Sequence, residues 1–408
     1  MTAVSVDEAL EIVLARAPRL ETEEVALEEA PGRVLAEDLA SDLDLPPFDR
    51  AMMDGYAVRS ADVGEAPVCL VVDGVLPAGG RWDATVGAGH AVQIMTGAPL
   101  PEGADAVQQV ERTRRVDEGH VELLAPVIAG QHVAARGSEV RAGQGVLSAG
   151  EYLDASSTAV LATIGRGRVR VGRRPRVAVL VTGDELIDVG RTPAGGQIRN
   201  SNGPTLLALV RAAGGEPRSL GVVGDDADAI RERVREGLDD DVLVISGGVS
   251  AGVFDLVEPV LEALGVEKLF DRVAIKPGAP LVFGHRERTL VFGLPGNPVS
   301  AQVTFELFVR PALRRMQGAR VITRACLDVV LLSRLANRSG RRAHLPARIR
   351  SQDGALVAEP LRSMGSADVV AHARANALIV LAAERTQAEA GERAAAIPLA
   401  SFLERGDE

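Results

Sequence analysis

Between about residues 176 and 317, apolar runs of strand length alternate with stretches of helical periodicity. Three of the runs, RVAVLVTG, PRSLGVVG and DVLVISGG, are rich in Val, Leu and Ile without regular polar alternation, which is typical of strands buried on both faces. The helical patterns that follow them are GPTLLALVRAAGG, DADAIRERVREGL and FDLVEPVLEALG. Strand–helix alternation with short Gly and Asp turns predicts a doubly wound α/β domain on a parallel sheet.

The remainder of the chain shows different patterns. Ser5 and Glu8 have capping-box spacing, so the N-terminus is expected to form a helix. Residues 46–139 are rich in turns and short apolar runs, which predicts a β-rich lobe. Near the C-terminus the spacing of turns predicts a small antiparallel barrel with strands in CLDVVLLSRL, RAHLPARIRS, ALVAEPL, DVVAHARANALIVL and ERAAAIPL. A long helix is expected to start at Asn297-Pro298, with its free N–H groups facing an anion.

Composition and charge narrow the function. The net charge of −11 makes nucleic acid or an anionic membrane surface a poor partner. No secretory leader and no apolar segment long enough to cross a bilayer is evident, so a cytoplasmic protein is expected. Cys69 and Cys326 are expected to be buried free thiols. The histidines are scattered without ligand spacing, which gives no support for a zinc site.

Chemistry-bearing residues gather where the predicted strands end. They are Gly183, Asp184 and Glu185 after the first strand, Asp225 after the second, Ser246, Gly247, Gly248, Ser250 and Asp255 after the third, and Pro295, Gly296, Asn297 and Pro298 after a later one. Ligands of doubly wound sheets bind outside the carboxyl ends of the strands. Glycines let backbone N–H groups approach a phosphate, whereas the acids would repel it unless a hard cation bridges them. The grouping therefore predicts a phosphate-bearing ligand held with Mg²⁺.

Three segments of the lobe stand out. PPFDRAMMDGYAVRSAD contains Asp54, IMTGAPLPEGADAV contains Thr96, and GQHVAARGSE contains Arg136. On spacing alone, Asp54 fits a turn cap as well as a functional acid, Thr96 fits a loop connection, and Arg136 fits an exposed solubilising charge. No Ser/His/Asp or Cys/His arrangement supports a covalent nucleophile.

Taken in order, PPFDRAMMDGYAVR, IMTGAPLPEGADAV, TGDEL, ISGGVSAGVFD, AIKPG and GLPGNPVSA closely resemble the molybdopterin molybdenumtransferase family, to which the E domain of gephyrin is related. The resemblance implies a multidomain α/β plus β protein. Its parts would be an elongated linker domain (1–45 and 140–174), an inserted β-rich lobe (46–139), an α/β molybdopterin-binding domain (175–323) and a C-terminal β-barrel (324–408).

The resemblance also implies an activity. Family members insert molybdate into adenylylated molybdopterin with Mg²⁺ or a similar divalent ion, releasing AMP and molybdenum cofactor. They act as homodimers whose site joins the α/β domain of one subunit to the lobe of the other. The implied protein partners are a molybdopterin adenylyltransferase and client molybdoenzymes, and no nucleic acid or membrane is expected.

Roles carry over by position. The implied catalytic residues are Asp54, Glu185, Asp225, Asp255 and Lys276, of which Glu185, Asp225 and Asp255 would hold the metal and Lys276 an anion. The implied ligand-binding residues are Thr96, Arg136, Gly183, Asp184, Ser246, Gly247, Gly248, Ser250, Pro295, Gly296, Asn297, Pro298 and Ser366.

Several positions depart from the family pattern. Four basic positions of the family are occupied by Ala134, Ala135, Ala279 and Pro346. Val253 replaces an acid, and Asn200 replaces the aspartate of a family motif. In the barrel, Ala343 replaces an acid and His344 replaces an aromatic residue. Each lost charge-assisted contact would cost about 1.5–3 kcal/mol of ligand binding. The departures leave two alternatives open. One is a weak or inactive paralogue acting as a dimeric scaffold or cofactor carrier; the other is a different phosphate-ester enzyme such as a molybdopterin adenylyltransferase.

Overall fold

A computed structural model describes residues 3–248 and 256–399. The chain forms two compact units. The first consists of Met1–Glu37, Ala149–Ala155 and Arg168–Glu408, and the second of Asp38–Ser148 and Ser156–Gly167. Among the described residues, no helix is both long enough and apolar enough to span a membrane.

A six-stranded sheet forms the centre of the first unit. Its strands, in spatial order, are β16 (Glu216–Val223), β13 (Arg176–Thr182), β17 (Val242–Ser246), β21 (Thr289–Leu294), β20 (Pro280–Arg286) and β18 (Glu267–Arg272). The first four are parallel, as the strand–helix alternation predicts. Strands β20 and β18 are antiparallel additions at one edge, because β21 follows β20 after a tight turn that leaves no room for a crossover.

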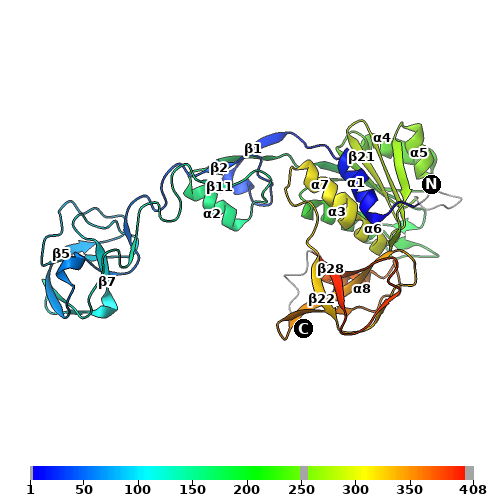
Figure 1. Ribbon diagram of the computed structural model, residues 1–408. Coiled ribbons are helices and arrows are strands. Elements are labelled where there is room, and N and C mark those ends of the chain that lie inside the picture. The colour runs from blue at the N-terminus through cyan, green and yellow to red at the C-terminus, as the bar shows by residue number, and fades with distance from the viewer. Residues whose placement is uncertain (1–2, 249–255, 400–408) are drawn as a thin grey trace. The chain divides into compact units, whose positions relative to one another are not determined.

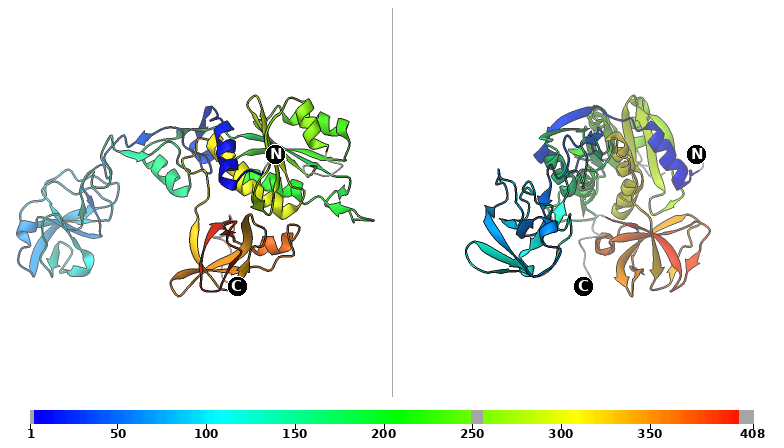
Figure 2. Two further views of the ribbon diagram at one scale, coloured as in Figure 1. Left: turned by 45° about the vertical axis from the view of Figure 1, so that its right-hand side comes forward. Right: turned by 60° about the vertical axis from the view of Figure 1, so that its left-hand side comes forward.

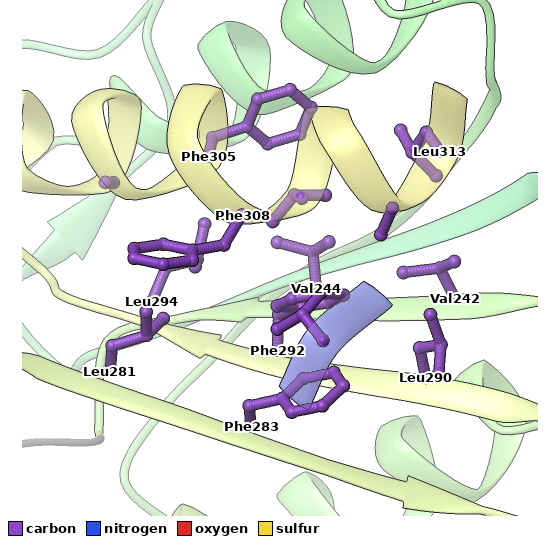
Figure 3. Close-up of a cluster of buried hydrophobic side chains, with 14 of the residues drawn as sticks. Val242, Val244, Leu281, Phe283, Leu290, Phe292, Leu294, Phe305, Phe308 and Leu313 are labelled. Atoms are coloured by element: carbon purple, nitrogen blue, oxygen red, sulfur yellow. The ribbon is translucent and has the colours of Figure 1, made fainter. Parts of the chain in front are cut away.

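Helices cover both faces of this sheet (Figure 1). They are α1 (Val6–Arg16), α3 (Asn202–Ala212), α4 (Ala227–Gly237), α5 (Val257–Ala263), α6 (Pro298–Thr304) and α7 (Arg310–Met316). Successive side chains of a strand point to opposite faces, so Val242 and Val244 of β17 pack with α3, α6 and α7, whereas Leu243 and Ile245 pack with α4 and α5. Figure 3 shows Phe308 lying over Leu294 of β21 and Leu281 of β20 in the first of these cores.

Two helix predictions had different outcomes. The Ser5–Glu8 capping box at the start of α1 is confirmed. The long helix after Asn297 is interrupted by a π-helical turn, η4 (Phe305–Val309), between α6 and α7. Pro311 explains the interruption, because it lacks the N–H that a regular α-helical turn would use at that position.

A closed barrel follows the α/β sheet and is also visible in Figure 2. Its strands are β22 (Leu327–Leu331), β24 (Arg342–Gln352), β25 (Ala355–Pro360), β26 (Ala377–Leu381) and β28 (Arg393–Pro398). The ring closes because β24 pairs with both β25 and β26, which confirms the expected small barrel. The barrel is not antiparallel throughout, contrary to expectation, because β22 and β25 pair in parallel. The expectation of a strand throughout DVVAHARANALIVL was wrong, because its first half forms α8 (Val369–Arg374), capped by the Asp368 carboxylate.

Short elements complete the first unit. They are β1 (Thr22–Ala26) with β12 (Arg168–Gly172), β14 (Leu186–Ile187) with β15 (Ile198–Arg199), β23 (Leu335–Ala336) with β27 (Gln387–Ala388), β19 (Ile275–Lys276) beside β24, and the 3-10 turn η1 (Leu27–Glu29). The β19–β24 pairing connects the α/β region to the barrel.

The second unit is β-rich, as its turns and short apolar runs predict. Its main sheet has the order β7 (Ala106–Gln109), β4 (Gly55–Val58), β6 (His90–Ile94), β5 (Val68–Leu76), β9 (His120–Leu123) and β8 (Thr113–Arg115). It also contains β2 (Leu39–Ala40), β3 (Arg50–Ala51), β10 (Val133–Ala134), β11 (Gly145–Leu147), η2 (Ser60–Asp62), η3 (Val110–Arg112) and all but the first residue of α2 (Ala155–Thr163). Small apolar cores lie on both faces of the sheet.

The two cysteines are free, but the expectation that they are buried was wrong. Cys69 lies on β5, where buried and exposed positions alternate, and its side chain is on an exposed position. Cys326 immediately precedes β22 and is also exposed. An apolar run therefore did not distinguish a strand buried on both faces from one with a solvent face.

Candidate functional site

A cavity of about 950 Å³ opens at the carboxyl ends of β13, β17 and β21 and extends to the barrel. Residues from distant parts of the sequence converge on it. Those expected from the sequence are Gly183, Glu185, Asp225, Ser246, Gly247, Gly248, Lys276, Pro295, Gly296, Asn297, Pro298 and Ser366. Ser250, Val253 and Asp255 lie outside the described residues. The cavity has the size of a small-molecule or cofactor site.

The turn after β17 needs glycine for two reasons. Gly247 and Gly248 have φ values of +100° and +63°, which L side chains rarely adopt. A Cβ on Gly247 would lie 2.4 Å from the carbonyl oxygen of Thr182, and a Cβ on Gly248 would lie 2.7 Å from Cγ2 of Val257. The turn therefore packs directly against β13 and α5 and forms a smooth wall of the cavity.

Asp184 has a structural contact at this edge of the sheet. It is absent from the cavity lining, and its Oδ1 accepts a hydrogen bond of 2.9 Å from the backbone N–H of Asp225. That bond ties the turn after β13 to the turn after β16. Glu185, the next residue, does line the cavity together with Asp225.

The cavity is lined by cationic groups as well as acidic ones. Lys276 lines it from β19, and Arg341 lines it from the segment before β24. Neither side chain forms an ion pair with another residue of the described ranges. Arg341 was not among the expected site residues, although it lies two residues before Ala343, in a stretch compared with the family pattern.

Asn202, the first residue of α3, was also missed. Its side-chain nitrogen donates to Ser246 Oγ at 2.8 Å and to the carbonyl oxygen of Gly296 at 2.7 Å. The contact joins the ends of two strands far from Asn202 in sequence. Two sequence signals were present: its place beside the predicted start of a helix, and its position two residues after Asn200 in a family motif.

The start of α6 differs from its prediction. Asn297 is the N-cap and Pro298 occupies the first turn, as expected. The N–H of Val299 is not free for an anion, because it donates to the carbonyl oxygen of Ser366 at 3.0 Å. This bond brings the Ser366 segment of the barrel to the cavity and satisfies one of the unpaired donors of the helix.

Within the described ranges, no group of three or more His, Cys, Asp or Glu side chains is arranged to hold a metal ion. Two of the three expected metal ligands, Glu185 and Asp225, line the same cavity. The third, Asp255, is among the residues that the structure leaves undescribed.

The lobe residues belong to the second unit. Both the N–H and the hydroxyl of Thr96 donate to Asp54 Oδ1, each at 2.7 Å. These bonds, the hydroxyl first, lower the pKa of Asp54. Gly55 follows at the start of β4, where a Cβ would lie 1.9 Å from the carbonyl oxygen of Gln108, so only glycine fits beside Asp54.

Arg136 is engaged within the same unit. Its Nε donates to Asp44 Oδ2 at 2.7 Å, and its backbone N–H donates to Asp49 Oδ1 at 2.7 Å. The N–H of Ala142 and then the Arg136 guanidinium lower the pKa of Asp44. Arg136 thus fixes the loop around Asp49, although its side chain is still 66% exposed.

Comparison with known proteins covers nearly the whole chain. Residues 4–165 match the MoeA N-terminal region (domain I and II), residues 178–315 a probable molybdopterin binding domain, and residues 328–399 the MoeA C-terminal region (domain IV). A protein of Bacillus subtilis (strain 168) named molybdopterin molybdenumtransferase is 37% identical over 93% of this chain and 90% of its own length. A crystal structure of the molybdopterin biosynthesis MoeA protein from Pyrococcus horikoshii OT3 is 32% identical, with a TM-score of 0.82 over 97% of this chain and 100% of that one.

Proposed function

Since the chain belongs to the MoeA family of molybdopterin molybdenumtransferases, we propose that it inserts molybdate into adenylylated molybdopterin, releasing AMP and molybdenum cofactor. The resemblance inferred from the motifs is confirmed, as are the transferase class and the place in molybdenum cofactor biosynthesis. The adenylylated substrate, the divalent ion and the homodimer are parts of our proposal.

The observation that carries the proposal is the mixed chemistry of one cavity. The Gly247–Gly248 turn leaves room for a ligand to approach the backbone closely, Lys276 and Arg341 offer positive charge, and Glu185 and Asp225 offer carboxylates. A ligand with phosphate groups needs the first set, and a divalent ion that accompanies it needs the second. Both sets line about 950 Å³, enough for a pterin with a phosphate-linked nucleotide end.

The residues present fit Mg²⁺. This ion prefers oxygen ligands and is commonly held by one or two carboxylates together with substrate phosphates. Glu185 and Asp225 supply two carboxylates at the cavity, and Asp255 is the third expected ligand. When bound, the ion would neutralise the charge that develops on the phosphate during cleavage.

The protein groups would act by position and charge. Lys276 and Arg341 would bind anionic groups, either molybdate or the ligand phosphate. The glycine turn, which carries no side chains, would let the ligand approach the backbone closely. Asp54, whose lowered pKa keeps its carboxylate ionised, would orient a water or the oxyanion, with Thr96 fixing its orientation.

One observation favours a second candidate function. Ala279 lines the cavity at a position where the family pattern has a lysine, so one anion-binding charge is absent there. A weak or inactive paralogue that carries or scaffolds the cofactor would tolerate that loss. The matches to the MoeA N-terminal and C-terminal regions favour either candidate over an adenylyltransferase, which should need neither region.

The test is AMP release from adenylylated molybdopterin with the purified chain, Mg²⁺ and molybdate. Asp54→Ala should abolish it. Asp117→Ala is the matched control, because Asp117 is another exposed lobe carboxylate that accepts hydrogen bonds within its own turn. Normal release from Asp54→Ala would remove Asp54 from the mechanism, and ligand binding by the unmodified chain without any release would support the carrier.

A further inference from the structure

We infer that Asn202 is a positioning residue that fixes two turns of the cavity wall for a phosphate-bearing ligand. The inference rests on the proposed function, since it concerns the same cavity. Asn202 is the first residue of α3, and it ends the segment 198–202 that lines the cavity.

The hydrogen bonds determine which way the amide is oriented. A backbone carbonyl can only accept, so the atom 2.7 Å from the Gly296 oxygen must be the amide nitrogen. The same nitrogen lies 2.8 Å from Ser246 Oγ, so both of its hydrogens are used. Ser246 Oγ in turn donates to the carbonyl oxygen of Pro295 at 3.3 Å. One side chain therefore ties the end of β17 to the turn after β21.

The hydrogen bonds of Asn202 lie where the regular pairing of two strands ends. The regular pairing of β17 with β21 ends at Ser246 and Leu294, and a bond from the Gly247 N–H to the Leu294 carbonyl at 3.2 Å continues it by one step. Beyond that point the turns diverge around the cavity. Asn202 and Ser246 are 8% and 0% exposed, so water cannot easily replace a lost bond.

The geometry also explains why the residue is asparagine. Two hydrogens on one nitrogen serve two acceptors, which a hydroxyl cannot do. Aspartate has the same shape but no donor, and it would place a negative oxygen against the Gly296 carbonyl. Loss of the amide should therefore free the Gly247–Gly248 and Gly296–Pro298 turns while leaving the sheet intact.

Asn202→Asp tests this, with Asn376→Asp as the matched control. Asn376 is a 2% exposed asparagine in the barrel whose amide exchanges two hydrogen bonds with the backbone of Ile349, at 2.7 and 2.9 Å. It does not line the cavity. Both variants replace a buried amide donor by a carboxylate. If Asn202→Asp does not fold, Asn202→Ala removes the donor without adding a charge.

Two readouts separate positioning from general destabilisation. Calorimetric titration of the full chain with adenylylated molybdopterin and Mg²⁺ measures affinity, and hydrogen exchange of peptides covering residues 242–248 and 291–298 measures the turns. We expect Asn202→Asp to weaken binding roughly tenfold to a hundredfold and to speed exchange in both peptides. Asn376→Asp should change neither.

Binding and exchange by Asn202→Asp equal to those of the unmodified chain would overturn the inference, as would equal losses in Asn376→Asp. If the unmodified chain does not bind adenylylated molybdopterin, the proposed function fails on its own. The exchange measurement still decides whether Asn202 holds the two turns, because it needs no ligand.

Discussion

Thr96 donates two hydrogen bonds of 2.7 Å to a single oxygen, Oδ1, of the Asp54 carboxylate. One comes from its hydroxyl and the other from its backbone N–H. Together they lower the pKa of Asp54, although this carboxylate is exposed at the lobe surface. An exposed acid held in one orientation and kept ionised is a better candidate for chemistry than one that only caps a turn.

The hydroxyl bond can be removed without disturbing the backbone bond. Thr96→Val keeps the shape of the side chain and the backbone N–H, so the pKa of Asp54 should rise but remain below its ordinary value. If ionised Asp54 is required, the acid limb of the pH profile of AMP release should move to higher pH. Rates measured across the acid range with the unmodified chain and the variant check this.

Thr113→Val is the control for that experiment. The Thr113 hydroxyl donates to the carbonyl of Val110 at 2.8 Å, elsewhere in the same lobe. It should leave the acid limb where it is. An acid limb that does not move in Thr96→Val would mean that another group controls it.

His344 predicts a loss of stability in acid. The side chain is 2% exposed on β24, and its burial, followed by the nearby charge of Arg342, lowers the pKa to about 4 from the ordinary 6.5. The unfolded chain therefore takes up a proton that the folded chain rejects as the pH falls below 6.5. Stability present at neutral pH should be lost progressively toward pH 4, by about 3 kcal/mol in total from this group.

His344→Phe, which restores the aromatic residue of the family pattern, should remove that loss. Urea unfolding at several pH values, followed by circular dichroism, measures the slope of stability against pH. A smaller slope should remain, because burial also lowers the pKa of His372. An unchanged slope in His344→Phe would contradict the prediction.

Local patterns predicted the strands that carry the cavity. The apolar runs before Gly183, Ser246 and Pro295 became β13, β17 and β21, whose carboxyl ends bring the expected residues together. Parallel strands must end at a common edge, so this convergence follows from topology alone. The burial of PRSLGVVG was overestimated, because β16 is an edge strand in which only Leu220 is fully covered.

Residues that contact the site over long sequence separations were not predictable in the same way. Asn202 lies 44 residues from Ser246 and 94 from Gly296 in the sequence. The periodicity of apolar residues within a helix or strand cannot predict contacts over such separations. Arg341 reaches the cavity through the pairing of β19 with β24, which depends on how the barrel attaches. The boundaries expected for the four domains, and the roles assigned to the site residues, stay predictions.

The glycine turn after β17 can be tested by a matched pair. Gly221 has φ +83° with no atom close to an added Cβ, whereas Gly247 has φ +100° and meets the Thr182 carbonyl oxygen at 2.4 Å. Gly221→Ala should cost only the backbone strain, about 1–3 kcal/mol. Gly247→Ala should cost more and should also weaken ligand binding. Thermal unfolding and calorimetric titration measure the two effects, and equal effects from both variants would mean that the close packing of the turn is unimportant.

Substitution of Ala279 by lysine is expected to strengthen ligand binding. It lines the cavity three residues after Lys276, and its carbonyl accepts the Val273 N–H at 2.9 Å, so its backbone is anchored. Ala279→Lys restores the cation of the family pattern. A second ammonium beside Lys276 should strengthen binding of adenylylated molybdopterin by about tenfold at low salt, and the gain should shrink as salt is raised.

The neutral control for that variant is Ala279→Gln, which adds length without charge and should give no salt-dependent gain. If Glu185 and Asp225 captured the new ammonium instead, Ala279→Lys would bind the ligand no better, and the electrostatic account of the cavity would be wrong. AMP release by these variants also distinguishes the transferase from the cofactor carrier. AMP release by the unmodified chain means that Lys276 and Arg341 suffice, whereas release only after Ala279→Lys means that loss of one charge converted a transferase into a carrier.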